Sequence, residues 1–146
     1  MIKLQCKKLS ETAKVPSKAH TEDAAYDLFA DLPNGDLHIA AGQTKIVPTN
    51  IAVMPPQGWS CDIRGRSGMS SKGKLVCIGL VDAYYTGPWG VILFNSTPDT
   101  IEIKHHDKIA QFTVNKVNDS VLDFVNEFDI PTNTRGEGGF GSTGSK

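Results

Sequence analysis

The chain has 146 residues, 39% of them hydrophobic and 21% charged, which is enough for one domain with its own hydrophobic core. Its formal net charge of −1 excludes a generally basic surface for nucleic acid, so any phosphate site must be local. The N-terminus lacks the apolar core of a signal peptide, and no window approaches the roughly 18 apolar residues of a membrane span. We therefore expect no nucleic-acid or membrane partner, and a location in the cytoplasm, or in the host cytoplasm if a phage or virus encodes the protein.

Short apolar or alternating runs recur along the chain and predict strands at 2–6, 44–47, 51–54, 59–63, 75–78, 91–94, 100–103 and 109–117. Turn residues such as Pro33-Asn34-Gly35 separate these runs. Many short strands divided by turns predict an all-β fold, as a sandwich, jelly roll or barrel. The best helical candidate is a turn or two within residues 67–72.

Composition changes near the C-terminus. Residues 129–146 include five glycines and little apolar content beyond Ile130 and Phe140. Such a segment cannot bury enough surface to hold itself in place. The sequence therefore predicts a domain at 1–128 and a flexible arm at 129–146, which a ligand or partner would order.

The arm contains RGEGGFGSTG at 135–144, a pattern suited to phosphate. Glycines let backbone N–H groups approach an anion closely, and Ser142 and Thr143 add hydroxyl donors. Arg135 adds a planar, bidentate cation. Phe140 has no core to join and is free to stack on a base. The segment is not a Walker loop, and a plain flexible tail is the alternative interpretation.

A second candidate is the loop at 64–73, which mixes cations, hydroxyls and glycines. Ser67 and Gly68 at the start of a short helix would present free N–H groups to an anion. The alternative is a solvated basic loop.

The segment 79–87 is predicted to form a hairpin, with one strand before Asp82 and another from Trp89. A carboxylate among aromatic and apolar neighbours is a plausible base for activating water. The alternative is a turn aspartate that caps its own backbone.

Three further positions carry weaker signals. Asp27 interrupts an apolar run, so its carboxylate must pair or serve a site. Gln111 alternates with Ile109 and is predicted on the polar face of a strand, where it could also be an ordinary exposed residue. His105 and His106 resemble a metal pair, but adjacent strand residues face opposite sides, which favours an ordinary turn.

In this order, the segments AAYDLFA, GRSGMSSK, GLVDAYYTG, DKIAQF and RGEGGFGSTG resemble the five motifs of the trimeric dUTPase family. The resemblance runs from about Ala24 to Gly144, and the fifth motif matches essentially in full. It implies a distorted jelly-roll β-barrel that assembles as a homotrimer. Each active site would draw motifs one, two and four from one subunit, motif three from a second, and motif five from the arm of a third.

The resemblance also implies hydrolysis of dUTP to dUMP and pyrophosphate with Mg²⁺. Asp82 would activate the water that attacks the α-phosphorus, and Asp27 would act on Mg²⁺ through coordinated water. Tyr85 would pack under the deoxyribose and exclude a ribose 2′-hydroxyl. The other implied substrate contacts are the uracil edge at Ile78, Gly79, Leu80 and Gly90; the phosphates at Arg66, Ser67, Gly68, Gln111, Arg135, Gly141, Ser142 and Thr143; and the uracil face at Phe140.

Three residues depart from the family pattern. Tyr84 stands where an acidic or small residue is usual, and His106 stands where glycine is usual. Trp89 replaces a smaller residue and is expected to reach a neighbouring subunit. Two other functions stay open: a dCTP deaminase on the same fold, for which motif three offers no convincing glutamate, and a trimeric regulatory protein that senses the nucleotide.

Overall fold

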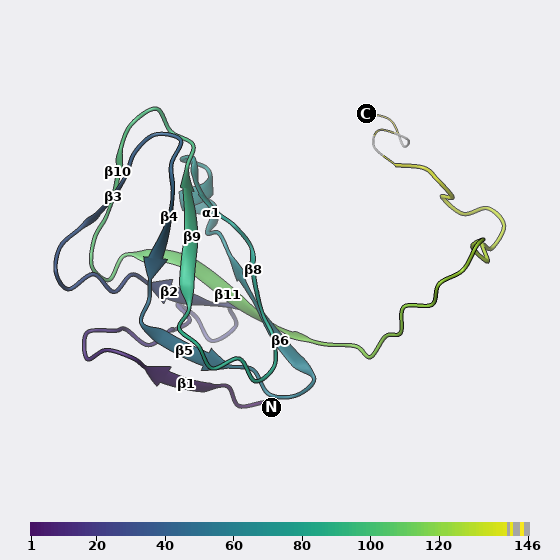
Figure 1. Cartoon of the computed structure of the whole chain (residues 1–146), viewed down its shortest axis with the longest axis horizontal. Coiled ribbons are helices and arrows are strands. Elements are labelled where there is room, and N and C mark those ends of the chain that lie inside the picture. Colours follow the sequence, from purple (N-terminus) through teal and green to yellow (C-terminus); the bar gives the residue numbers. More distant parts are fainter. Residues whose placement is uncertain (140, 142–143, 145–146) are drawn as a thin grey trace.

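The computed structural model describes residues 1–139, 141 and 144, and it is built almost entirely from short strands (Figure 1). One helical turn, α1 (Ser67–Ser70), lies where the sequence predicts a helix. The strands are β1 (Gln5–Lys8), β2 (Ala25–Phe29), β3 (Leu37–Ile39), β4 (Thr44–Pro48), β5 (Ile51–Met54), β6 (Trp59–Arg64), β7 (Lys74–Val76), β8 (Gly79–Val81), β9 (Gly90–Asn95), β10 (Ile101–Ile103) and β11 (Lys108–Lys116).

The strands pair antiparallel in four groups, ordered β2-β11-β6-β8, β4-β9-β7, β1-β5 and β3-β10. Within the described part of the chain, backbone pairing does not close these groups into one continuous barrel. The all-β class predicted from the sequence is confirmed. The four-stranded sheet matters most for function, because its strands carry or lead into four of the five predicted motifs.

The hairpin predicted around Asp82 is wrong. The strands on either side of Asp82 do form, but they do not pair with each other. β8 pairs with β6, whereas β9 pairs with β4 and β7. The segment between them is therefore a crossing between two sheets, and local sequence pattern does not distinguish such a crossing from a hairpin.

The core lies between the sheets and is mostly aliphatic. Its largest fully buried apolar side chains are Leu28, Ile39, Val47, Ile51, Val53, Val91, Leu93, Ile109 and Phe112. The ring of Phe112 packs edge-on against Trp89, with 4.9 Å between centroids, and stacks on Tyr26 at 5.1 Å. Trp89 is 2% exposed, so the expectation that it reaches a neighbouring subunit is wrong: its indole fills the core of its own chain.

The chain leaves the barrel after β11 and runs away from it as an extended arm (Figure 1). Among the described residues, the last hydrogen bond from the chain to the barrel body runs from the Val117 amide to the Gly58 carbonyl. Beyond it, several large apolar side chains are almost fully exposed, namely Val121, Leu122, Phe124 and Phe128. The division at residue 128 stays a prediction. No helix in the described residues is long and apolar enough to cross a membrane.

Candidate active site

A cavity of about 280 Å³ opens beside the end of β8. It is lined by Ile63, Gly79, Leu80, Val81, Asp82, Tyr85, Pro88, Trp89 and Gly90. Five residues predicted for catalysis or for binding the base and sugar are therefore brought together. Ile78 is not among the lining residues; it lies just before β8 and is 72% exposed.

Asp82 comes directly after β8, whose last residue, Val81, is buried opposite Cys61 of β6. The backbone turns at once, with the Tyr85 amide donating to the Asp82 carbonyl at 3.3 Å. The Asp82 side chain is exposed and accepts no hydrogen bond from any residue the structure describes. Its carboxylate is thus not used to cap the turn, and it is free to act on a ligand or water.

Tyr85 is positioned by a close approach to Gly87. A Cβ added at Gly87 would lie 2.4 Å from the Tyr85 Oη and 2.6 Å from its Cζ, so only glycine leaves room for the ring. The Tyr85 hydroxyl also donates to the Pro88 carbonyl at 3.3 Å. The ring is 46% exposed and lines the cavity, so its position sets one wall of the cavity.

The return from this turn is fixed through Trp89. Its amide donates to the Ile51 carbonyl at 2.9 Å, and its carbonyl accepts the Thr49 hydroxyl at 2.5 Å. Because the indole is also buried in the core, the segment between Asp82 and Gly90 is held firmly at its far end. The cavity wall is therefore part of the rigid scaffold.

A second cluster forms where β2, β6 and β11 meet. Gln111 of β11 lies opposite Asp27 of β2 on one side and Arg64 of β6 on the other. The Asp27 carboxylate contacts Arg66 Nε at 3.3 Å and Lys108 Nζ at 2.8 Å. Residues of three predicted motifs are thus joined by the pairing of one sheet.

The same cluster leads into α1. The first bonds of this turn run from the amides of Met69 and Ser70 to the Arg66 carbonyl. The amides of Ser67 and Gly68 precede these bonds and make no backbone bond to any described residue. Gln111 supports the approach to the turn by donating to the Gly65 carbonyl at 2.9 Å.

The cavity and the Asp27 cluster lie far apart within one chain. From Asp27 to β8 there are three strand spacings, or about 14 Å at about 4.8 Å each. The ladder also places Asp82 beyond the pair Cys61–Val81, whereas the Asp27 cluster aligns with Arg64. That offset adds about three to four residues, or about 10–13 Å along the strands. A single chain therefore does not bring both groups to one small ligand.

Comparison with known proteins identifies the family. The model of the dUTPase family matches residues 11–144, which is nearly the whole chain. A deoxyuridine 5′-triphosphate nucleotidohydrolase of Arabidopsis thaliana is 39% identical over 139 residues, covering 94% of this chain and 81% of that protein. The chain belongs to the dUTPase family. The enzyme of the same name from Gloeothece citriformis is 37% identical and is covered almost end to end, at 98% of this chain and 97% of that one.

Solved dUTPase structures agree with this fold. A point mutant of the Staphylococcus bacteriophage 80alpha dUTPase with dUpNHpp is similar at a TM-score of 0.88 and 27% identity, covering 99% of each chain. A point mutant of the dUTPase from phage phi11 of S. aureus, whose structure describes a structural Mg(II) ion, has a TM-score of 0.80 at 26% identity, over 88% of this chain and 100% of that chain. The family, the enzyme class and the jelly-roll fold predicted from the sequence are confirmed. The roles of individual residues stay predictions.

Two departures from the dUTPase motifs occur at special backbone positions. Tyr84 has φ 65° and His106 has φ 66°, the left-handed region that glycine, asparagine and aspartate enter most readily. Histidine therefore has to adopt this backbone conformation in the turn at residue 106. The turn is stabilised by the His106 Nε2, which bonds the Thr12 carbonyl at 2.7 Å. The Tyr84 amide is held by the Pro55 carbonyl at 3.0 Å.

The paired histidines form a turn, as the sequence favours, although the reason differs. Their rings lie close together at a 30° tilt, with 3.7 Å between centroids, next to the buried carboxylate of Asp31. The His105 Nδ1 accepts the Leu32 amide at 2.9 Å, and the His106 Nε2 contacts the Thr12 carbonyl, so both histidines already serve the turn.

Sequence reasoning missed two polar groups. Lys108, inside motif four, contacts Asp27, and only the register of β11 on β2 reveals this. Asp31 is 1% exposed and accepts hydrogen bonds from Ser10, Thr12 and Asn50. Burial raises the pKa of Asp31, but these three bonds outweigh it and hold the pKa below its ordinary value of 3.8. Asp31 joins the N-terminal loop to the barrel and lies outside the cavity.

The described arm residues do not line the cavity of their own chain. Arg135 and Gly141 are both exposed, and the arm runs away from the barrel (Figure 1). The predicted contacts at Phe140, Ser142 and Thr143 lie outside the described residues.

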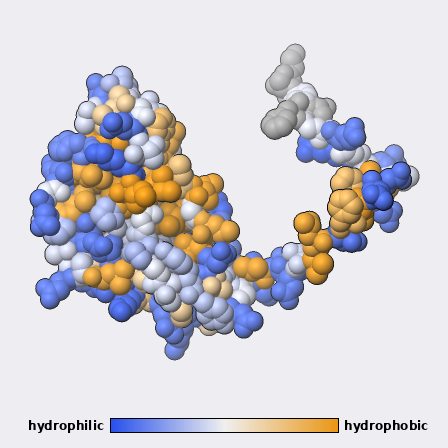
Figure 2. All heavy atoms as spheres, in the orientation of Figure 1, coloured by the Kyte–Doolittle hydropathy of each residue, from blue (hydrophilic) through white to orange (hydrophobic). Residues whose placement is uncertain are grey.

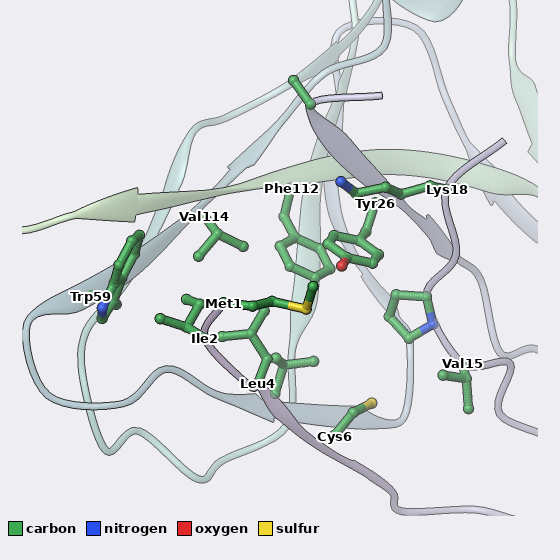
Figure 3. A pocket seen from close by; sticks show the side chains of 13 residues that line it. Met1, Ile2, Leu4, Cys6, Val15, Lys18, Tyr26, Trp59, Phe112 and Val114 are labelled. Carbon is green, nitrogen blue, oxygen red and sulfur yellow. The ribbon is translucent and has the colours of Figure 1, made fainter. Parts of the chain in front are cut away.

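A larger cavity, of about 420 Å³, lies under the N-terminal strand (Figure 3). Figure 3 shows it lined by apolar side chains, among them Ile2, Leu4, Tyr26 and Phe112. Lys18 is the charged side chain among its lining residues, and its ammonium lies over the Tyr26 ring at 4.9 Å. No carboxylate or imidazole of the described residues lines this cavity, so the smaller cavity at Asp82 is the better candidate for chemistry.

Proposed function

We propose that this dUTPase-family chain binds dUTP and hydrolyses it to dUMP and pyrophosphate, using water activated by Asp82 to attack the α-phosphorus. The observation that carries this proposal is the free carboxylate of Asp82 at the cavity formed by β8 and Tyr85. A positioned base contributes about 10²–10⁴ in rate. The family assignment favours this reaction over deamination of dCTP, and the dUpNHpp complex of the phage 80alpha relative supports dUTP as the ligand.

Uracil recognition follows from the place of β8 at the edge of its sheet. One side of β8 pairs with β6, and among the described strands its other side has no partner. Backbone groups that alternate residues of β8 present on that side are available to bond the edge of a planar base. Rigid backbone donors and acceptors discriminate uracil from cytosine, whose edge offers the opposite pattern. We propose that the base lies close enough to β8 for the strand to exclude the methyl group of thymine.

Tyr85 accounts for the choice of sugar. Its ring forms one wall of the cavity and is held by Gly87 and by the Pro88 carbonyl. A deoxyribose packs flat on such a ring, whereas the 2′-hydroxyl of a ribose would clash with the ring. We therefore assign Tyr85 as the residue that excludes UTP.

The phosphates would lie on the Asp27 cluster and the amides of Ser67 and Gly68, together with Gln111. Mg²⁺ fits this cluster through water rather than directly, because both Asp27 oxygens already have a cation partner. When bound, the ion neutralises phosphate charge and aligns the leaving pyrophosphate. The chain's own groups bind the phosphates, hold the sugar and accept the proton of the attacking water at the Asp82 carboxylate.

We further propose that the active sites are shared within a homotrimer. The distance between Asp82 and the Asp27 cluster in one chain supports this, because one triphosphate must contact both. Apolar side chains lie exposed on strands of both larger sheets, including Ile46 of β4 at 67% and Leu80 of β8 at 65%. Figure 2 shows this apolar surface over β8 and β9, and again along the arm. Other subunits would cover it, and the arm would bring Arg135, Phe140, Gly141, Ser142 and Thr143 to a neighbour's nucleotide.

The test is pyrophosphate release measured across dUTP, dTTP, dCTP and UTP, with Mg²⁺ and with a chelator. We expect kcat/KM for dUTP to exceed that for each of the other nucleotides by at least about 10²-fold. The others would either clash with the site or leave its polar groups without hydrogen-bond partners. We also expect the chelator to lower the dUTP rate. Comparable rates for dUTP and UTP would contradict the role of Tyr85, and ammonia release from dCTP would overturn the assigned reaction.

A further inference from the structure

Lys108 is the least explained charge at the candidate site. Its Nζ lies 2.8 Å from Asp27 Oδ2, while Arg66 Nε lies 3.3 Å from Oδ1. One carboxylate thus faces two cations, and the cluster carries one net positive charge. Asp27 is 13% exposed at its side chain and Lys108 is 42% exposed, so the carboxylate is enclosed while the ammonium reaches solvent.

The backbone explains why the ammonium is here and why it can move. Lys108 begins β11, directly after the turn that contains the two histidines, and the register on β2 shifts between Lys108 and Ala110. Its carbonyl accepts Arg66 Nη1 at 3.4 Å, which ties the guanidinium to the strand. Arg66 is therefore fixed at two points, whereas among the described residues the Lys108 ammonium is held by its ion pair alone, on a flexible four-carbon stem.

We propose that Lys108 is a phosphate-binding residue, held by Asp27 in the free protein and transferred to the nucleotide when Mg²⁺ and substrate bind. This inference rests on the proposed function. A triphosphate brings about four negative charges to a cluster that has one surplus cation, and lysine is a common point-charge ligand of phosphate. Hydrated Mg²⁺ and the ammonium are both attracted to the Asp27 carboxylate, so the arrival of one favours the departure of the other.

Two opposite effects follow from this exchange. Without the ammonium, the nucleotide loses a charged phosphate contact, so its affinity falls. Without the same ammonium, Asp27 loses a competitor for Mg²⁺, so less Mg²⁺ is needed. A purely structural role for Lys108 would not produce this combination, because misfolding of the cluster would weaken both ligands together.

The experiment is calorimetric titration of dUpNHpp and of dUMP into the full-length protein, over a series of Mg²⁺ concentrations. The variant is Lys108→Gln, which keeps a polar side chain without its charge. The matched control is Lys116→Gln, at the other end of the same strand. We expect Lys108→Gln to weaken dUpNHpp by about tenfold or more, since charged hydrogen bonds are the strong ones. The fold-loss in affinity for dUMP should be at least about five times smaller than the fold-loss for dUpNHpp. The Mg²⁺ concentration that gives half-maximal dUpNHpp binding should fall.

Equal losses for dUpNHpp and dUMP, an unchanged affinity for dUpNHpp, or a higher Mg²⁺ requirement would each overturn the inference. Thermal unfolding of both variants accompanies the titration, and Lys108→Met replaces Lys108→Gln if the latter unfolds earlier than the control. Failure of the wild-type protein to bind dUpNHpp would overturn the proposed function and this inference together. Normal wild-type binding with no change in the variant would overturn the inference alone.

Discussion

Replacing Gly87 by alanine tests how the sugar wall of the cavity is positioned. The new Cβ would lie 2.4 Å from the Tyr85 Oη, whereas ordinary contacts begin near 3.4 Å, so the ring must retreat by about 1 Å. This retreat also ends the 3.3 Å bond from the Tyr85 hydroxyl to the Pro88 carbonyl. Because the ring is 46% exposed, it can swing into solvent, and the cost in stability should be only about 1 kcal/mol.

The effect on selectivity should be larger than the effect on stability. A misplacement of about 1 Å near reacting groups can cost about 10²-fold in rate. We expect kcat/KM for dUTP to fall by about ten- to a hundredfold, while UTP changes less because the wall against its 2′-hydroxyl has moved away. The assay is pyrophosphate release from both nucleotides, with Thr86→Ala as the control in the same turn. An unchanged ratio of dUTP to UTP would refute the reasoning, and so would the same change in the control.

Two further predictions concern the arm and acid stability. Deleting residues 135–146 should leave a folded trimer, as measured by light scattering, because the last strand ends at Lys116. Activity should fall at least about 10²-fold, because charged phosphate contacts are removed. A monomer in light scattering would show instead that this segment is structural. For Asp31, the pKa is lowered in the folded chain, so its stabilisation is present above the ordinary value of 3.8 and is lost as the pH falls through the lower folded value. At fixed protein concentration, the urea midpoint should therefore fall more steeply below pH 4 for wild type than for Asp31→Asn, and parallel profiles would count against this account.

Features that depend on residues close together in the sequence could be predicted from the sequence alone. The all-β class, the position of α1 and the grouping of Asp82 with Tyr85 follow from short apolar runs and from residues three positions apart. The family was also accessible, because the five motifs keep their order. The start of a helical turn at Ser67 and Gly68, directly after Arg66, was predicted correctly, and the phosphate-binding roles of these three residues stay predictions.

What the sequence could not provide is pairing between distant strands. The contact of Lys108 with Asp27 depends on a register shift in β11, and no pattern within either segment encodes it. The false hairpin at Asp82 has the same origin, since turn residues look alike whether the flanking strands pair or diverge. Trp89 was misplaced because a large aromatic after a turn fits an interface as well as a core, and only its packing on Phe112 decides.

The central claim is that Asp82 supplies the base while the rest of the cavity supplies binding. It is tested most directly by Asp82→Asn, assayed for single-turnover hydrolysis of dUTP and for dUpNHpp affinity in one preparation. Removing the base should slow hydrolysis by about 10²–10⁴-fold, whereas affinity should change by less than about threefold because the amide keeps the shape of the carboxylate. Hydrolysis at a rate near wild type would contradict the claim.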